Sequence, residues 1–355
     1  MIDRSEADIM STWITEDKTT PMVSVRCMVY NHVKYIENAL DGFLKQETTF
    51  PFEVIVHDDC STDGSTQLIR IYEERYPNII RAFYEEENQF SKINGAQRVV
   101  KMLQNAYRGK YVALCEGDDY WNASDKLQKQ FEALESNPTI SVCVCRTHIE
   151  YEDGENSDRE EFIPPHNFDV NSSRIINSDE LAELIFGDVA YPFHASGFFY
   201  TKEFEIYGGL EALGKFTEGD EIKLRQAIIF GGVYFINEVM SCYRWLAKGS
   251  WTVDYFSKTE EEKYVHARNQ AKANTIFDEI TEGRFHSLIQ KRNFSILRRW
   301  LFIVNTRMVI KDISMIVGND VTKAVRMKGK FIYWLAQYAP HLGKCLYRWY
   351  SKLGG

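Results

Sequence analysis

The sequence predicts an α/β protein with a mostly parallel central sheet flanked by helices. Short apolar segments alternate with segments of helical periodicity between residues 21 and 145, which is the pattern of βαβ units. Several of the apolar segments stop at acidic or amide side chains. A hydrophobic fraction of 44% is ordinary for a globular protein, so the chain can bury a sizeable core.

The individual elements follow from local patterns. Runs of β-branched and other apolar residues predict strands at 21–31, 52–60, 78–86, 110–119 and 139–145. Apolar side chains three or four residues apart predict helices at 32–46, around 68–72, at 94–109 and at 124–138. Residues 61–65, STDGS, combine turn formers with a helix-capping residue and therefore predict the turn before the second helix.

The rest of the chain changes character twice. Residues 150–175 are acidic and rich in turn formers, which predicts an exposed insertion, and mixed structure then resumes to about residue 255. From Thr259 onward the pattern is helical. Residues 291–355 carry 13 Lys and Arg against 2 Asp, a net charge of +11, while the whole chain carries −9. A basic tail on an acidic body indicates a separate role for the tail.

Composition also excludes some classes of protein. A net charge of −9 does not favour binding to nucleic acid. Seven dispersed cysteines without a CxxC pair do not predict a disulfide framework or a zinc site, and they fit a reducing compartment. Residues 1–20 form a polar leader rather than a signal peptide, and no run of 18 uncharged apolar residues predicts a spanning helix. We therefore expect a cytoplasmic protein.

Three of the predicted strands end in polar residues. They are Tyr30 and Asn31, then Asp58 and Asp59, then Glu116, Asp118 and Asp119. If the strands are parallel, these groups meet at one edge of the sheet, where α/β proteins bind ligands. Neighbouring carboxylates repel one another, so the acidic cluster suits Mg²⁺ or Mn²⁺, which prefer oxygen ligands. The alternative for an isolated EGDD is a loop of solvated acids.

Three segments together resemble the nucleotide-sugar-binding half of glycosyltransferase family 2: residues 21–46, 52–65 and 110–130. These are inverting enzymes with the GT-A fold, and the likeness is to the group that builds bacterial capsule, lipopolysaccharide and other surface glycans. Residues 218–250 resemble the acceptor-side motif of the family. The resemblance implies a GT-A domain at 21–255, with a nucleotide-sugar half at 21–150, an acceptor half at 151–255 and a helical C-terminal region at 256–355.

The resemblance also implies roles in donor binding. Tyr30 would stack on the base beside Asn31, and Asp59 would accept a hydrogen bond from the base imide, with Asp58 as its neighbour. Asp118 would face the ribose and contribute to the metal site. Asp119 would bind the Mn²⁺ or Mg²⁺ that bridges the diphosphate. Glu116 stands where many relatives carry Asp, and its longer arm fits metal contact through water.

Further roles concern the reaction itself. Asp220, in EGDE, matches the family's general base, although an acidic first turn favoured by the helix dipole would look the same. Arg244 or Lys248 would stabilise the leaving diphosphate. Lys92 and Arg98 are candidates for phosphate or base contact, with solvated helix positions as the alternative. His194 and Ser196 lie where relatives line the acceptor pocket, although a packed strand histidine is equally consistent with the pattern.

These roles predict one sugar transfer with inversion. The donor would be a nucleotide diphosphate sugar, UDP-linked by expectation, and the acceptor a hydroxyl of a surface glycan or lipid-linked oligosaccharide. A carboxylate would take the hydroxyl proton. A metal-dependent nucleotidyltransferase or phosphohydrolase and a non-catalytic glycan-binding scaffold remain alternatives. The basic C-terminal helices, rich in Trp and Tyr, would lie on the inner face of the cell membrane, bind a partner, or pack on the catalytic domain.

Overall fold

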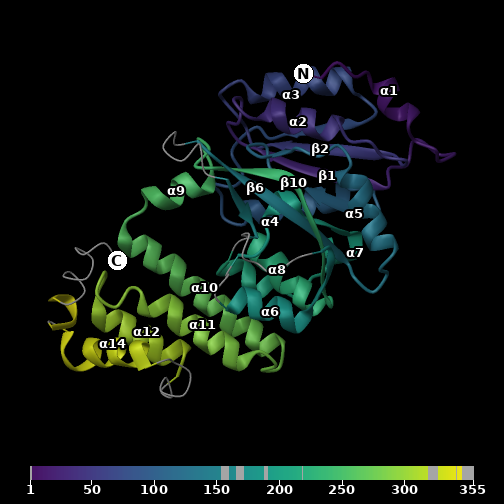
Figure 1. Ribbon diagram of the computed structural model, residues 1–355. Coiled ribbons are helices and arrows are strands. Elements are labelled where there is room, and N and C mark those ends of the chain that lie inside the picture. Colours follow the sequence, from purple (N-terminus) through teal and green to yellow (C-terminus); the bar gives the residue numbers. More distant parts are fainter. Residues whose placement is uncertain are drawn as a thin grey trace. The chain divides into compact units, whose positions relative to one another are not determined.

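The computed structural model describes residues 2–152, 160–164, 172–187, 191–217, 219–318, 327–340 and 342–345 (Figure 1). The chain forms two compact units, each with its own core. Unit 1 comprises Met1–Leu181, Tyr191–Gly208 and Phe230–Asp254. Unit 2 comprises Ala182–Ala190, Gly209–Ile229 and Tyr255–Gly355.

Unit 1 is built on one sheet that contains every strand of the described residues. Its main path runs in the order β3-β2-β1-β4-β9-β6-β10-β5, while β7 pairs with β6 and β8 pairs with β10. The strands are β1 (Val23–Val29), β2 (Phe52–Asp58), β3 (Ile80–Tyr84), β4 (Tyr111–Leu114), β5 (Tyr120–Trp121), β6 (Val142–Tyr151), β7 (Glu161–Ile163), β8 (Arg174–Asn177), β9 (Phe199–Thr201) and β10 (Gly232–Trp245).

The first four strands in the path are parallel, as the alternation of strands and helices predicts. β1 pairs in parallel with β2, placing Val29 opposite Asp58, and with β4, placing Arg26 opposite Leu114. β2 and β3 are also parallel. Helices connect these strands, and Figure 1 shows α2 (Ile36–Leu44) and α3 (Ser65–Arg75) over one face of β1 and β2.

The second half of the sheet is mixed. β9 pairs antiparallel with both β4 and β6, and β6 then pairs in parallel with β10. β9 has only three residues, so its sequence contains too little pattern to be recognised. The predicted α/β sheet with flanking helices is confirmed, with antiparallel strands added to its parallel part.

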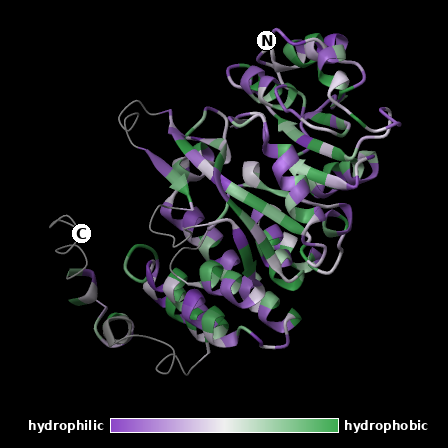
Figure 2. Ribbon diagram, turned by 45° about the vertical axis from the view of Figure 1, so that its right-hand side comes forward, coloured by the Kyte–Doolittle hydropathy of each residue, from purple (hydrophilic) through white to green (hydrophobic). Residues whose placement is uncertain are grey.

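The helices and apolar strands of unit 1 enclose one large core. Val25, Cys27, Val54 and Phe43 are fully buried in it, and Figure 2 shows the central strands as mostly hydrophobic. The helices before and around this core are α1 (Glu6–Ser11), α4 (Gly95–Ala106), α5 (Lys126–Glu135) and α7 (Lys202–Glu205). Helices α6 (Ser178–Phe186) and α9 (Trp251–Ser257) begin in unit 1 and end in unit 2.

Unit 2 is helical where described, as expected from Thr259 onward. Its helices are α8 (Gly219–Ile229), α10 (Glu260–Ile280), α11 (His286–Arg298), α12 (Thr306–Ile316) and α14 (Met327–Tyr338). Thr259 and Glu262 form a capping box that starts α10. Tyr264, Phe294 and Leu297 are buried in the core between these helices. In the part of the chain that the structure describes, no helix is long and apolar enough to cross a membrane.

Candidate functional site

The candidate site lies where β1, β2 and β4 end. The Asp59 amide donates to the Val29 carbonyl at 2.9 Å, and the Gly117 amide donates to the Met28 carbonyl at 2.9 Å. The segments that carry Asp59 and the EGDD acids therefore both continue along the end of β1. This confirms the expectation that the polar ends of these strands meet at one edge of the sheet.

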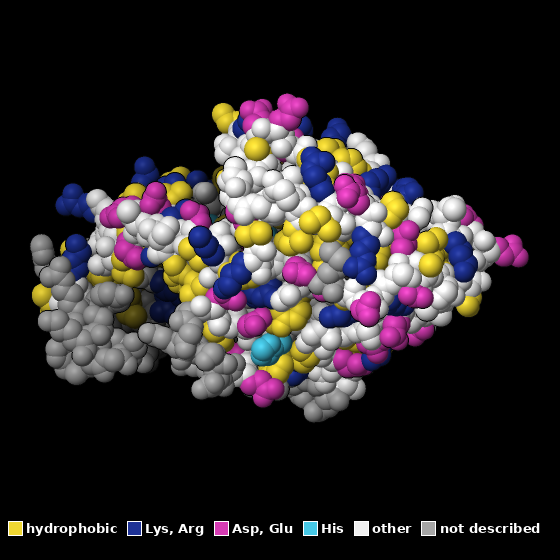
Figure 3. Space-filling model, turned by 90° about the horizontal axis from the view of Figure 1, so that it is seen from above, with side chains coloured by type: hydrophobic (Ala, Val, Ile, Leu, Met, Phe, Trp, Pro, Cys, Tyr) yellow, Lys and Arg dark blue, Asp and Glu magenta, His cyan; other side chains and the backbone are white. Residues whose placement is uncertain are grey.

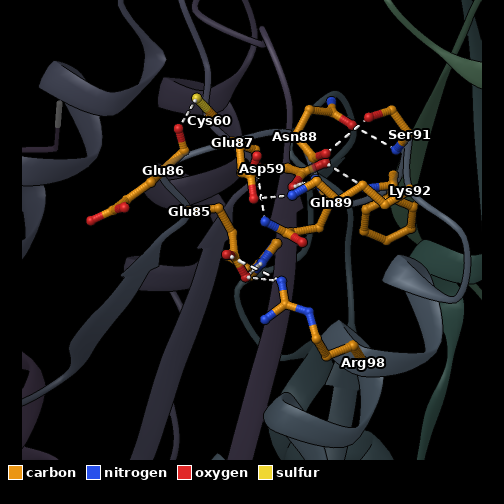
Figure 4. A network of polar contacts seen from close by, with 12 residues as sticks. Asp59, Cys60, Glu85, Glu86, Glu87, Asn88, Gln89, Ser91, Lys92 and Arg98 are labelled. Atoms are coloured by element: carbon orange, nitrogen blue, oxygen red, sulfur yellow. Dashed lines mark hydrogen bonds and ion pairs between the residues drawn. The ribbon is translucent and has the colours of Figure 1, made fainter.

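Asp59 is buried and holds the loop that follows β3. One of its carboxylate oxygens accepts the Gln89 amide at 2.7 Å, and the other accepts the Phe90 amide at 3.2 Å (Figure 4). Because a carboxylate oxygen can accept two hydrogen bonds, each oxygen keeps capacity for one further donor. Asp59 can therefore anchor this loop and still receive a hydrogen bond from a ligand.

Its neighbours Asp58 and Asn31 hold the turn that leads into α3. Asp58 accepts the Ser61 amide at 3.2 Å and the Thr66 hydroxyl at 2.5 Å. The Asn31 side chain accepts the Thr62 amide at 2.8 Å. Both residues therefore shape the rim of the site through hydrogen bonds to this turn. Tyr30, in contrast, is 42% exposed, so its ring has surface available for a ligand.

Lys92 and Arg98 are neutralised by nearby carboxylates. Lys92 forms an ion pair with Glu87, and the Arg98 guanidinium lies 3.4 Å from Glu85 (Figure 4). Both lysine and arginine side chains are at least 40% exposed, so they are solvated in this structure. Arg98 lies on α4 (Gly95–Ala106), whereas Lys92 precedes this helix, and phosphate or base contact by either residue stays a prediction.

The three acids of EGDD have different surroundings. Glu116 lies 3.6 Å from the buried Arg26 guanidinium. An Asp118 oxygen lies 4.0 Å from Nε2 of His32, and 12% of the Asp118 side chain is exposed. Asp119 is almost fully buried, and one of its oxygens accepts the Arg244 amide at 3.1 Å. The exposure of the acids to solvent therefore decreases from Glu116, which is half-buried, to Asp119, which is almost fully buried.

Arg244, on β10, is packed against this acidic segment. Its Nη1 donates to the Asp118 carbonyl at 2.7 Å, and its Nε lies 3.4 Å from Glu150. The guanidinium also lies over the rings of Tyr120, at 4.5 Å, and Tyr35, at 5.2 Å. These contacts hold a permanent positive charge beside Asp118 and Asp119. Lys248, the other candidate, has an exposed side chain, and its backbone amide donates to the Tyr35 hydroxyl at 3.1 Å.

His194 and Ser196 also lie beside the acids. Nδ1 of His194 is 2.9 Å from the Ser196 hydroxyl and 3.7 Å from an Asp119 oxygen. The imidazole stacks on Tyr243 with ring centroids 4.1 Å apart. The backbone of this turn is fixed by a further hydrogen bond, because the Trp121 indole donates to the Ser196 carbonyl at 3.0 Å. His194 is therefore both packed and next to the acidic cluster.

Burial makes the ionised form of Asp119 costly. Desolvation, with the charge of Asp118, raises the pKa of the Asp119 carboxyl well above its ordinary value, against the opposing effect of the Arg244 contact. Desolvation also lowers the pKa of His32, so this imidazole contributes little positive charge near neutral pH. A cation placed at Asp118 and Asp119 would offset the repulsion between these two carboxylates.

The acidic cluster meets part of the requirements of a divalent cation. No group of three or more His, Cys, Asp or Glu side chains in the described residues has the arrangement of a metal centre. Mg²⁺ in nucleotide sites takes one or two carboxylates and completes its shell with phosphate and water. Asp118 and Asp119 fit that arrangement, whereas Glu116 is engaged by Arg26. The residues therefore fit a cation that arrives with a diphosphate.

Asp220 lies in unit 2, in the first turn of α8, and is half-buried. Glu221 follows it and is bonded within unit 2 to Thr217, Arg225 and Gln270. The acidic start of a helix is therefore confirmed, and the catalytic role of Asp220 remains a prediction.

Sequence reasoning missed several residues that contact the acids or Arg244, among them Arg26, His32 and Glu150. Arg26 had a signal, because it is a charged residue inside an apolar strand that the pattern places in the core. His32 follows Asn31 in a loop, and Glu150 ends a long strand, so neither was distinguishable from a surface residue. Their proximity to the site comes from pairing between distant segments.

The face of the protein seen in Figure 3 carries charges of both signs. Acidic and basic side chains are interspersed among the described residues on that face.

Several known proteins are similar to this chain. The model of the family Glycosyl transferase family 2 matches residues 24–199. An uncharacterised protein of Mycobacterium tuberculosis is 32% identical over 254 residues, which are 72% of this chain and 66% of the relative. The chain thus spans less than two thirds of that relative's length. The poly(ribitol-phosphate) β-N-acetylglucosaminyltransferase TarS of Staphylococcus aureus is 36% identical over 102 residues, 28% of this chain and 16% of TarS.

Solved structures of S. aureus TarS residues 1–349 share the fold. The complex with UDP superimposes with a TM-score of 0.61 at 16% identity, covering 94% of this chain and 92% of the other. The complex with UDP-GlcNAc gives a TM-score of 0.56 at 17% identity, covering 91% and 89%.

Proposed function

We propose, because the chain belongs to glycosyltransferase family 2, that it transfers one sugar from a nucleotide diphosphate sugar to a hydroxyl of a glycan or lipid-linked acceptor. The observation that carries this proposal is the meeting of Asp59, the EGDD acids and Arg244 at one edge of the sheet. The complexes of TarS with UDP and UDP-GlcNAc support a UDP-linked donor.

The donor would lie across the ends of β1, β2 and β4. Tyr30 offers an exposed ring for the base, and Asp59 has a free acceptor position for the base imide. Asp118 and Asp119 would hold Mn²⁺ or Mg²⁺ with the diphosphate, and this ion would neutralise charge on the leaving group. Arg244 supplies a fixed cation beside them, which stabilises the negative charge that develops on the diphosphate as its bond to the sugar breaks.

Asp220 would be the general base. An acceptor hydroxyl is a poor nucleophile near neutral pH, so a carboxylate that takes its proton during attack contributes about 10²–10⁴-fold in rate. A single displacement on the face opposite the leaving group inverts the anomeric centre, whereas retention requires a second nucleophilic step. We expect Asp220→Asn to lower kcat by a factor in that range while leaving nucleotide affinity nearly unchanged.

The first experiment identifies the donor. Thermal unfolding is followed with UDP-GlcNAc, UDP-glucose, UDP-galactose, GDP-mannose and free UDP, each with and without Mn²⁺. A ligand at 100 times its Kd should stabilise the protein by about 2.7 kcal/mol. We expect a UDP-linked donor to give the largest shift, and only with the metal. If no nucleotide shifts the midpoint in the presence of Mn²⁺, a non-catalytic scaffold replaces this proposal.

The second experiment separates transfer from hydrolysis. Release of UDP from the identified donor is measured with and without a panel of glycan acceptors. A transferase should release UDP faster when an acceptor is added and should form a product with inverted configuration. A nucleotidyltransferase or phosphohydrolase would instead consume the donor at the same rate with or without an acceptor.

A further inference from the structure

The start of α8 is held by a network of buried and half-buried polar side chains within unit 2. Glu221, directly after Asp220, receives hydrogen bonds on both carboxylate oxygens. Gln270 of α10 donates to one oxygen at 2.5 Å. The Thr217 hydroxyl and Arg225 Nη1, the latter at 3.2 Å, reach the other. The residue next to the proposed base is therefore bonded to the chain before its helix, to its own helix and to α10.

Arg225 continues the network into the helical core. Its Nη1 also donates to the Glu221 carbonyl at 2.8 Å, and its Nη2 donates to Asn274 at 2.6 Å. Asn274 donates in turn to Asn293 of α11 at 2.9 Å. Arg225, Asn274 and Asn293 are all at most 4% exposed. One continuous path of bonds thus joins the first turn of α8 to α10 and α11.

A cavity of about 20 Å³ adjoins this network, lined by Glu221, Arg225, Gln270 and Asn274 among others. Its size suits a single water molecule. Nε of Arg225 has no hydrogen-bond partner among the described residues. An ordered water in this cavity would have polar side chains of the network as partners.

Stability alone does not require such a network. Desolvation lowers the pKa of Arg225, which reports the cost of burying its charge. Burying a charged pair costs so much desolvation that well-packed apolar residues of the same size are often as stabilising or more so. What the bonds do supply is a fixed orientation of the helix start, because each of them is directional and each partner is itself restrained.

We propose that Glu221 and Arg225 are positioning residues, which fix the first turn of α8 so that Asp220 keeps one orientation. This inference rests on the proposed role of Asp220 as the base. A carboxylate that must take a proton from an acceptor hydroxyl has to stay within hydrogen-bond reach of it, about 2.6–3.2 Å. Loosening the turn should therefore lower turnover without weakening donor binding.

The variants are Glu221→Gln and Arg225→Lys. Glutamine keeps the shape of Glu221 but removes the charge that Arg225 pairs with. Lysine keeps the charge of Arg225 but cannot bridge Glu221 and Asn274 together. The matched control is Asp312→Asn, which removes a carboxylate that accepts from Tyr264 at 2.6 Å and lies 3.8 Å from Arg268. This control pair also links helices of unit 2 but is not part of the network at α8.

Two readouts are compared at a temperature where all variants are folded. The first is the acceptor-dependent release of UDP from UDP-GlcNAc with Mn²⁺. We expect kcat to fall at least tenfold in both variants, with KM for the donor within twofold of wild type, and to stay within twofold in Asp312→Asn. The second readout needs no turnover: deuterium exchange of the peptide that spans 217–225 should accelerate about tenfold in the two variants and remain unchanged in the control.

The outcomes separate this inference from the proposed function. If exchange at 217–225 is unchanged in both variants, or if the control loses as much turnover as they do, the positioning role is wrong, whatever Asp220 does. If Asp220→Asn keeps full turnover, the base assignment fails and the positioning role fails with it. Faster exchange at 217–225 together with lost turnover in the two variants alone supports the inference.

Discussion

At the scale of single residues, the site contains ionisable side chains in buried positions, where their ionised form costs free energy. Asp119 is 2% exposed, and its ionised form is opposed by desolvation and by Asp118. A residue selected only for stability would not carry a carboxylate there. Sites that bind a charged ligand commonly retain such a cost, because the ligand removes it on binding.

Asp119→Asn should therefore make the ligand-free protein more stable and inactive. Because the pKa of Asp119 is raised in the folded state, the folded protein holds this proton more tightly than the unfolded chain does. Ionisation then destabilises the fold as pH rises from the ordinary carboxyl range toward the raised pKa. Asparagine does not ionise, so the variant avoids this loss of stability. At pH 7.5 we expect its Tm to be about 2–4 °C above that of the wild type, which corresponds to about 1 kcal/mol in the free energy of unfolding.

The check is calorimetry of both proteins at pH 5 and pH 7.5 without metal. The gain in Tm should be larger at pH 7.5 than at pH 5, and Mn²⁺ with UDP should stabilise the wild type alone. A variant that is less stable than wild type at both pH values would show that Asp119 contributes to the fold through its charge.

Arg244→Lys should lower kcat/KM by about 100-fold with little change in Tm. Lysine keeps the positive charge, but one ammonium group cannot reproduce the bond to the Asp118 carbonyl, the contact with Glu150 and the stacking on two aromatic rings. Initial rates of UDP release measure the effect. Arg174→Lys is the control, because Arg174 pairs with Glu180 elsewhere in unit 1. Equal losses in both variants would contradict a specific role for Arg244.

At the scale of elements, the loop after β3 is held between Asp59 and the start of α4. Asp59 binds the amides of Gln89 and Phe90, and α4 begins at Gly95 directly against the Gln89 carbonyl. There is no space for a side chain at Gly95, since a Cβ atom would collide with that carbonyl oxygen. The close approach of helix and loop therefore depends on this glycine.

Gly95→Ala should displace the loop and weaken nucleotide binding. A forced shift of packed backbone costs about 1–3 kcal/mol, and the displaced loop releases one side of Asp59. We expect a lower urea midpoint and at least a tenfold weaker affinity for UDP by titration calorimetry. Gly214→Ala is the control, because the nearest atom to its added Cβ would be 4.0 Å away. An unchanged UDP affinity in Gly95→Ala would separate the loop from the base pocket.

At the scale of the whole molecule, charge is divided along the chain. Residues 291–355 carry the excess of Lys and Arg. Within unit 2, α12 exposes Arg307, Lys311 and Met315, the last by 70%. The rings of Trp334 and Tyr338 on α14 are 51% and 67% exposed and lie 5.9 Å apart. Exposed aromatic and basic side chains together suit the surface of an anionic membrane, and we propose that unit 2 binds there.

The full chain should therefore sediment with vesicles that contain phosphatidylglycerol and not with vesicles of phosphatidylcholine alone. Binding should weaken between 50 and 300 mM salt, since attraction to lipid headgroups is screened. The double variant Trp334→Ala and Tyr338→Ala should lower the bound fraction about tenfold. Ile14→Ala is the control, because Ile14 is an even more exposed apolar residue, at 81%, but lies in unit 1. Binding that is unaffected by both salt and the double variant would contradict the proposal.

The sequence by itself determined the alternation of strands and helices, the acids at the strand ends and the helical C-terminal region, because these are properties of neighbouring residues. Strand direction then sufficed to bring Asp59 and the EGDD acids to one edge. Only the tertiary structure decided that Arg244 joins Asp119, 125 positions away, and that Nδ1 of His194 lies 3.7 Å from an Asp119 oxygen. Such contacts depend on which strands pair, and pairing is decided by packing of the whole unit, which no local pattern records.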